Sequence, residues 1–215
     1  MSEAPPYNRS DTLAPWADTI PGVGRMTIDA YEALPDDGWM YELVEGVLVR
    51  MPQSGGEASA IAARLLIRLG AYVEERGLGE LTGEAGGYNF SDLGQPDTEL
   101  GPDVAFVRAE RVATLTPEQY VKAWPLAPDL AVEVASPNQY HPEVAIKVKH
   151  YLDAGVRLVW IIWPRWQQVD VWHPGDDTEP AATLGIEDTL SGEDVVPDFS
   201  CPIAALLRRP IAPLP

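Results

Sequence analysis

The feature that most constrains the fold is a strand, a helix and a second strand in close succession. Residues 130–135 and 158–163 are short, largely apolar runs, and the second has the composition of a strand buried on both faces. Residues 142–154 between them carry apolar side chains at helical spacing, and Gly155 is placed to end that helix. This order is βαβ-like, so the chain is predicted to be an α/β protein.

The flanking segments predict further strands and helices around this unit. Residues 41–51 alternate as a β-hairpin does, with Glu45 and Gly46 at the turn. Residues 57–75 have the period of an amphipathic helix that ends at Gly77. The other predicted elements are a short helix capped by Thr27, strands at 79–90, 104–107 and 168–172, a polar loop at 91–101, a helical turn near Thr116, an edge strand at 184–190 and a short helix at 203–207.

Length and composition favour one domain of ordinary size. The chain has 215 residues, of which 46% are hydrophobic, enough for a proper core. Residues 1–24 are rich in proline and glycine without apolar periodicity, and they predict an extended N-terminal arm. Residues 25–210 are then expected to form the single domain.

The sequence also indicates where the protein is expected to work. Its longest apolar stretch, near residues 158–163, is far shorter than the roughly 20 residues that a membrane-spanning helix needs. The first residues lack the pattern of a secretory signal, and the single cysteine, Cys201, cannot form an internal disulfide. We therefore expect a cytoplasmic protein without a membrane partner.

Three polar residues lie in or beside these apolar segments. Asp103 precedes the run 104–107, Glu133 lies inside the strand 130–135, and Lys147 lies on the flank of the following helix. Carboxylates are rare in such strands unless they are paired, coordinated or catalytic, because an unpartnered buried charge is costly. The first hypothesis is therefore a functional site.

Two carboxylates and an ammonium suit phosphodiester hydrolysis. Mg²⁺ or Mn²⁺ commonly takes one or two protein carboxylates and keeps positions for water and phosphate, so Asp103 and Glu133 are candidate ligands. A metal held there can activate water, and Lys147 could orient that water or neutralise developing charge.

Each residue also has an ordinary structural interpretation, which stays open from the sequence. Asp103 can cap a turn after Pro102. Glu133 can form a buried salt bridge, for example with Lys147, and such pairs are poor evidence of function. Lys147 can equally be a surface lysine of its helix.

Four motifs in order then identify a family resemblance. The chain resembles the Uma-two family of endonucleases, which has the PD-(D/E)XK restriction-endonuclease-like fold. The resemblance runs from about residue 26 to 174 and rests on Tyr41-Glu-Leu-Val-Glu-Gly46, Gly101-Pro-Asp-Val-Ala-Phe106, Pro128-Asp-Leu-Ala-Val-Glu-Val134 and Lys147-Val-Lys-His-Tyr-Leu-Asp-Ala-Gly-Val-Arg-Leu-Val-Trp160. It implies a curved mixed β-sheet flanked by helices.

The resemblance also implies a role for each site residue. Asp103 matches the strand aspartate of the family, Glu133 the second acidic ligand, and Lys147 the lysine that has moved from the strand to the adjacent helix. Glu42 matches a further acidic position, although a solvent-facing strand residue would also suit its place in the hairpin. The implied activity is that of a Mg²⁺- or Mn²⁺-dependent DNA endonuclease, and a homodimer is expected because cutting both strands needs two sites or two events.

The net charge of the chain argues against DNA binding. The chain carries −18, whereas DNA binding normally demands a basic surface. One alternative is therefore a catalytically silent interaction module that keeps the nuclease fold and binds protein through its acidic surface. Another is a metal-free hydrolase with paired carboxylates, as in glycoside cleavage. Binding of a metal and sensitivity of the activity to a chelator distinguish the endonuclease, the interaction module and the metal-free hydrolase.

Overall fold

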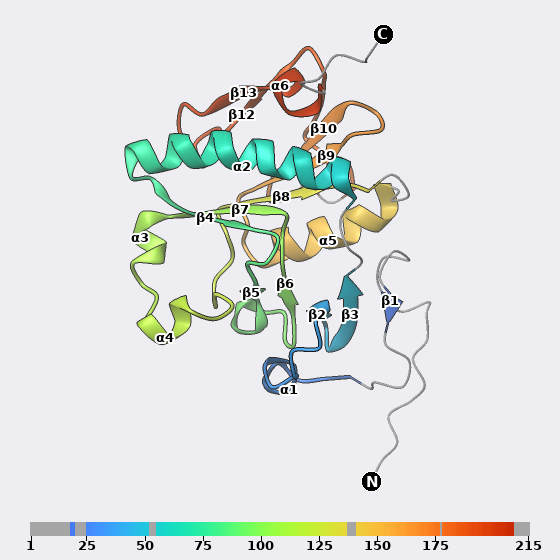
Figure 1. Cartoon of the computed structure of the whole chain (residues 1–215), viewed down its shortest axis with the longest axis vertical. Helices are drawn as coiled ribbons and strands as arrows, with labels where there is room; N and C mark the ends of the chain where they lie inside the picture. Colours follow the sequence, from blue (N-terminus) through green and yellow to red (C-terminus); the bar gives the residue numbers. More distant parts are fainter. Residues whose placement is uncertain (1–17, 20–24, 52–54, 137–140, 177, 209–215) are drawn as a thin grey trace.

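The centre of the structure, a computed structural model, is a six-stranded mixed sheet in the order β11-β10-β9-β8-β7-β4 (Figure 1). All neighbouring strands are antiparallel except β8 and β9, which are parallel and are connected through α5 (His141–Asp153). This confirms the βαβ-like unit. The strands are β4 (Gly79–Gly83), β7 (Val104–Arg108), β8 (Leu130–Val134), β9 (Leu158–Trp163), β10 (Gln168–Trp172) and β11 (Ala182–Gly185).

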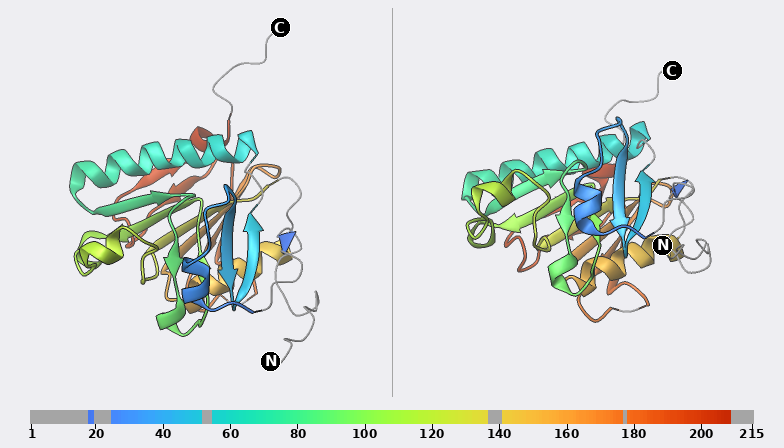
Figure 2. Two further views of the ribbon diagram at one scale, coloured as in Figure 1. Left: turned by 60° about the horizontal axis from the view of Figure 1, so that its bottom comes forward. Right: turned by 90° about the horizontal axis from the view of Figure 1, so that it is seen from below.

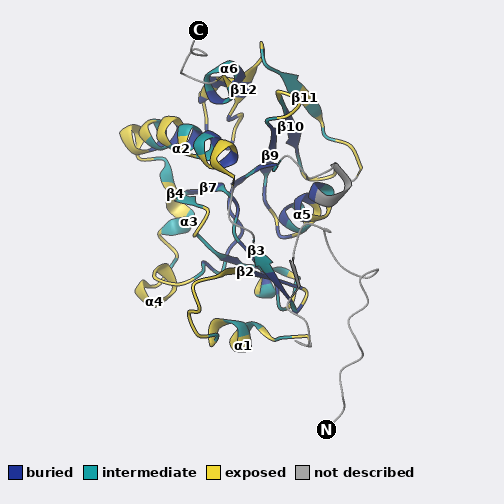
Figure 3. Cartoon of the chain, turned by 45° about the vertical axis from the view of Figure 1, so that its right-hand side comes forward, coloured by how far each residue is buried: buried dark blue, intermediate teal, exposed yellow. Residues whose placement is uncertain are grey.

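Two helices cover opposite faces of this sheet (Figure 1). Successive strand residues point to opposite faces, so Val104 and Phe106 pack toward α2 (Gly56–Arg76), while Ala105 and Val107 pack in the core that includes α5. The predicted helix α2 ends at Gly77, whose φ of 60° is the left-handed conformation of a helix C-terminus. Figure 3 shows the buried strands inside and the exposed side of α2 outside.

A second sheet, in the order β1-β3-β2-β6-β5, stands beside α5 (Figure 2). Its predicted hairpin is confirmed, and Glu45 and Gly46 both have positive φ, 47° and 79°, as a two-residue turn of this hand requires. The strands are β1 (Asp18–Thr19), β2 (Met40–Val44), β3 (Val47–Met51), β5 (Tyr88–Asn89) and β6 (Glu99–Leu100).

Three sequence predictions need correction. The run 79–90, expected as one strand, is divided between β4 and β5 in different sheets, because the chain turns at the glycine-rich segment 84–87. The expected loop 91–101 contains a 3₁₀ helix, η2 (Ser91–Leu93), and strand β6. The expected edge strand 184–190 is likewise two elements, β11 and β12 (Thr189–Ser191).

The remaining elements are short. They are α1 (Ile28–Glu32), capped by the Thr27 hydroxyl, α3 (Ala109–Val112), α4 (Pro117–Tyr120), β13 (Ser200–Pro202), which pairs with β12, and α6 (Ile203–Leu207). The predicted turn near Thr116 is confirmed as α4, which begins with a capping box and has proline at its first position.

The structure describes residues 18–19, 25–136 except 52–54, 141–176 and 178–208. Most of the predicted N-terminal arm, residues 1–24, therefore lies outside the described residues; its two described residues form β1, paired with β3. No helix in these ranges combines the length and apolar character needed to cross a membrane.

Candidate active site

Two neighbouring antiparallel strands bring Asp103 and Glu133 together. Because Val104 is paired with Val132, the next positions across the two strands are Asp103 and Glu133. The two-residue period of a strand places both on the face that packs toward α5. The backbone N–H of Val134 donates a hydrogen bond to Asp103 Oδ2 at 2.6 Å. The structure thus places both predicted acids at one point of the sheet.

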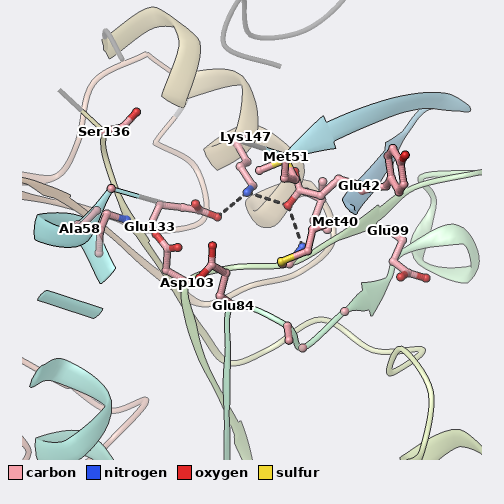
Figure 4. Close-up of a pocket in the computed structure, with 18 of the residues that line it drawn as sticks. Met40, Glu42, Met51, Ala58, Glu84, Glu99, Asp103, Glu133, Ser136 and Lys147 are labelled. Atoms are coloured by element: carbon pink, nitrogen blue, oxygen red, sulfur yellow. Dashed lines mark hydrogen bonds and ion pairs between the residues drawn. The ribbon is translucent and has the colours of Figure 1, made fainter. Parts of the chain in front are cut away.

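Lys147 reaches these acids from α5 and is buried, with 7% of its surface exposed. Its Nζ lies 2.9 Å from Glu133 Oε1 and 2.8 Å from Glu42 Oε1 (Figure 4). The alternative of a surface lysine is therefore wrong. A lysine on the flank of a helix can bend its long aliphatic stem inward, and here two carboxylates draw the ammonium into the protein. The salt bridge with Glu133, which was the other open interpretation, does form.

Glu42 is the second partner of Lys147, and it is only 4% exposed. The alternative of a solvent-facing strand residue is wrong, because Glu42 lies on the same face of β2 as Val44, which packs in the core that includes α5. The same Oε1 that contacts Lys147 also accepts a hydrogen bond from the Gly101 N–H at 2.9 Å. Glu42 therefore ties the second sheet to the site on the first.

Burial controls the charge of this cluster. It raises the pKa of Glu133 to about 7, although the Lys147 ammonium acts in the opposite direction. It also raises the pKa of Asp103, against the hydrogen bond from Val134 and the charge of Lys147. For Lys147, burial lowers the pKa, but Glu133 and Glu42 together outweigh it and hold the pKa above its ordinary value. One ammonium thus incompletely compensates the buried carboxylates.

These residues line a cleft of about 570 Å³ that also contains acids which sequence reasoning missed. Glu84 points toward Asp103 in Figure 4, and its charge contributes to the raised pKa of that residue. Glu99 lies further along the wall, and burial, Glu32 and Glu42 raise its pKa to about 7. Glu84 lies in the turn that divides residues 79–90, and Glu99 lies on β6 in the segment expected to be a loop. Neither feature was predicted, so no sequence signal placed these acids near Asp103.

Tyr151 was also missed as a site residue. The sequence puts it on the inward stripe of its helix, one turn after Lys147, and that spacing could have indicated it. Its hydroxyl donates to Glu133 Oε1 at 2.5 Å.

The donor set fits a hard divalent cation. Asp103 and Glu133 offer carboxylate oxygens, and burial raises the pKa of both, as expected for acids withdrawn from water. Within the described residues, no group of three or more histidines, cysteines or acids has the arrangement of a metal site. Two carboxylates beside a spacious cleft instead suit Mg²⁺ or Mn²⁺, which keep several waters.

Comparison with known proteins supplies the family. The model of Uma2, described as "Putative restriction endonuclease", matches residues 28–204. The chain belongs to the Uma2 family. This is the Uma-two family whose motifs the sequence resembles.

A solved structure has the same fold as this Uma2 chain. It is described as a "putative nuclease belonging to DUF820" from Anabaena variabilis, is 22% identical, and gives a TM-score of 0.71 over 85% of this chain and 97% of that one. The predicted restriction-endonuclease-like fold, a mixed sheet flanked by helices, is confirmed. No curated protein matches the chain. Family membership and fold together support a nuclease-like function.

Proposed function

We propose that this Uma2 protein is a metal-dependent DNA endonuclease. The observation that carries the proposal is the position of the Lys147 ammonium, 2.9 Å from Glu133 and 2.8 Å from Glu42, on the wall of the cleft where Asp103 neighbours Glu133. Acids from adjacent strands and a buried lysine are the groups that hydrolysis of a phosphodiester needs.

Each residue then has a distinct task. Asp103 and Glu133 hold Mg²⁺ or Mn²⁺, which when bound supplies a Lewis acid that polarises the phosphate and lowers the pKa of water. Lys147 hydrogen-bonds the attacking water or stabilises negative charge on the phosphoryl oxygens. Glu42 acts through Lys147, since its carboxylate and the Gly101 N–H form one chain of contacts that fixes the ammonium.

The charge of −18 favours a second candidate, the catalytically silent interaction module that binds protein through its acidic surface. DNA approaches an acidic protein only if local positive charge is supplied, and a bound divalent cation beside Lys147 would supply it at the site.

We further propose a cytoplasmic homodimer, which would present two such sites to the two strands of a duplex. Sedimentation equilibrium tests the dimer independently of activity.

Cleavage of supercoiled plasmid with Mg²⁺, with Mn²⁺ and with a chelator tests the leading proposal. Asp103→Asn and Glu133→Gln keep side-chain size and remove charge, and each is expected to lower the rate at least about 100-fold. The matched control is Glu110→Gln, an exposed acid that follows the other end of β7, which should cleave like the unmodified protein.

The same experiment separates the rivals. Failure to bind Mn²⁺ together with failure to cut DNA would favour the interaction module. Hydrolysis of a glycoside that persists in the chelator would favour the metal-free carboxylate pair and refute the nuclease. Equal DNA cleavage by Asp103→Asn and the unmodified protein would refute the assigned site.

A further inference from the structure

Tyr151 shares its hydrogen-bond acceptor with Lys147. The two residues are four apart on α5, so their side chains lie on one face of the helix. Lys147 Nζ lies 2.9 Å from Glu133 Oε1, and the Tyr151 hydroxyl lies 2.5 Å from the same atom. One carboxylate oxygen therefore receives two donors from successive turns of one helix.

The environment of Tyr151 holds its ring in place. The side chain is fully buried, and Phe90 packs edge-on against it with ring centroids 6.2 Å apart. The Lys147 Nζ lies 6.0 Å from the centre of the same ring.

This arrangement gives the two carboxylate oxygens of Glu133 different surroundings. Both donors that the described residues present to its carboxylate meet Oε1. Saturating Oε1 from one side restricts rotation of the carboxylate and leaves Oε2 as the oxygen available to a cation shared with Asp103. A lysine alone has three donors on a flexible stem and could draw both oxygens toward itself; a rigid phenol opposes that movement.

We infer that Tyr151 is a positioning residue that orients Glu133 for binding a divalent cation. The inference rests on the proposed function, because it concerns the metal site assigned there. Groups that hydrogen-bond to a metal ligand typically change metal affinity 10- to 100-fold when they are removed, since an unoriented ligand must be ordered on binding.

The test measures binding of Mn²⁺ itself, by electron paramagnetic resonance of the free ion, in the absence of nucleic acid. Tyr151→Phe removes only the hydroxyl and is expected to weaken Mn²⁺ binding about 10- to 100-fold. The matched control is Tyr88→Phe. Tyr88 is also fully buried, and its hydroxyl makes a 2.8 Å hydrogen bond to Thr82 Oγ1, away from the two acids.

The control separates positioning from a merely structural role. Both variants lose one buried hydroxyl, so both should show a similar decrease in melting temperature, while only Tyr151→Phe should lose Mn²⁺ affinity. Mn²⁺ affinity of Tyr151→Phe within twofold of the unmodified protein, or an equal loss in Tyr88→Phe, overturns the inference. Absence of Mn²⁺ binding by the unmodified protein overturns the metal site of the proposed function, and the inference with it.

Discussion

Replacing Lys147 by methionine is expected to destabilise the protein strongly and in a pH-dependent way. Methionine matches the lysine stem as far as Cε and removes the ammonium that lies within 3 Å of two buried carboxylates, 2.8 Å from Glu42 and 2.9 Å from Glu133. At an effective dielectric constant of about 20, each contact represents about 6 kcal/mol of Coulomb energy, much of it offset by the desolvation of the charges. Removing one partner of a buried ion pair typically costs about 3 to 5 kcal/mol.

The pH dependence follows from Glu133. Its pKa of about 7 in the folded protein is above that of an unfolded glutamate, so between the two values the folded state binds more protons and stability falls as pH rises. Without the ammonium, that pKa rises further. The loss of free energy of unfolding caused by Lys147→Met should therefore be largest near about pH 8. This deficit should shrink toward about pH 5, where protonation of Glu133 removes the uncompensated charge.

Equilibrium unfolding in urea, followed by tryptophan fluorescence with chelator present, measures this deficit. Lys149→Met is the matched control on the same helix, because Lys149 is exposed and its pair with Asp153 is a surface pair worth less than about 1 kcal/mol. A deficit below about 1 kcal/mol near about pH 8, or one that does not change with pH, would refute the reasoning. Mg²⁺ in place of the chelator should narrow the difference, since a cation that substitutes for the missing ammonium stabilises the folded variant more than the folded unmodified protein.

Two further predictions concern stability away from the ion pair. Glu99→Gln is expected to stabilise the protein by about 1 to 3 kcal/mol near about pH 8 and to be neutral near about pH 4. The reason is that Glu99 has a pKa of about 7 and that its buried Oε2 has no hydrogen-bond partner among the described residues. Thermal melting at both pH values checks this, and a gain in stability that does not depend on pH would contradict it. Gly79→Ala is expected to cost at least about 2 kcal/mol, because a Cβ there would lie 2.0 Å from the Val107 carbonyl oxygen, whereas Gly70→Ala, whose Cβ would meet only Leu81 at 4.0 Å, should stabilise α2 by about 0.5 to 1 kcal/mol. Denaturant midpoints of both variants compare these costs directly, and equal midpoints would contradict the close approach of β4 and β7.

Local sequence signals were sufficient for the elements whose patterns are self-contained. The hairpin 41–51, the helix that ends at Gly77 and the unit from Leu130 to Trp163 all follow from spacing and from residues that favour turns and helix ends. Asp103 and Glu133 could also be singled out, because a charge within an apolar strand is conspicuous without any knowledge of its partner.

Other features depended on contacts between distant segments. The break of residues 79–90 into β4 and β5 was not predicted, because each half pairs with a different sheet, and strand pairing is a long-range property. Glu84 reaches the cleft at that break, and Glu99 reaches it on β6, a strand in the segment expected to be a loop. Sequence spacing carries no record of such neighbours.

The sequence by itself determined the chemical groups of the site, their order and the faces of the elements that carry them. Only the tertiary structure decided that Glu42 is buried and that Lys147 turns inward. Both facts arise because the second sheet packs beside α5, and once water is excluded there, an ammonium and two carboxylates are stable only in contact with one another. An alternating strand pattern or a helical angle predicts the direction in which a side chain leaves the backbone. The final position of its charged group depends on the other charges that the tertiary structure places nearby.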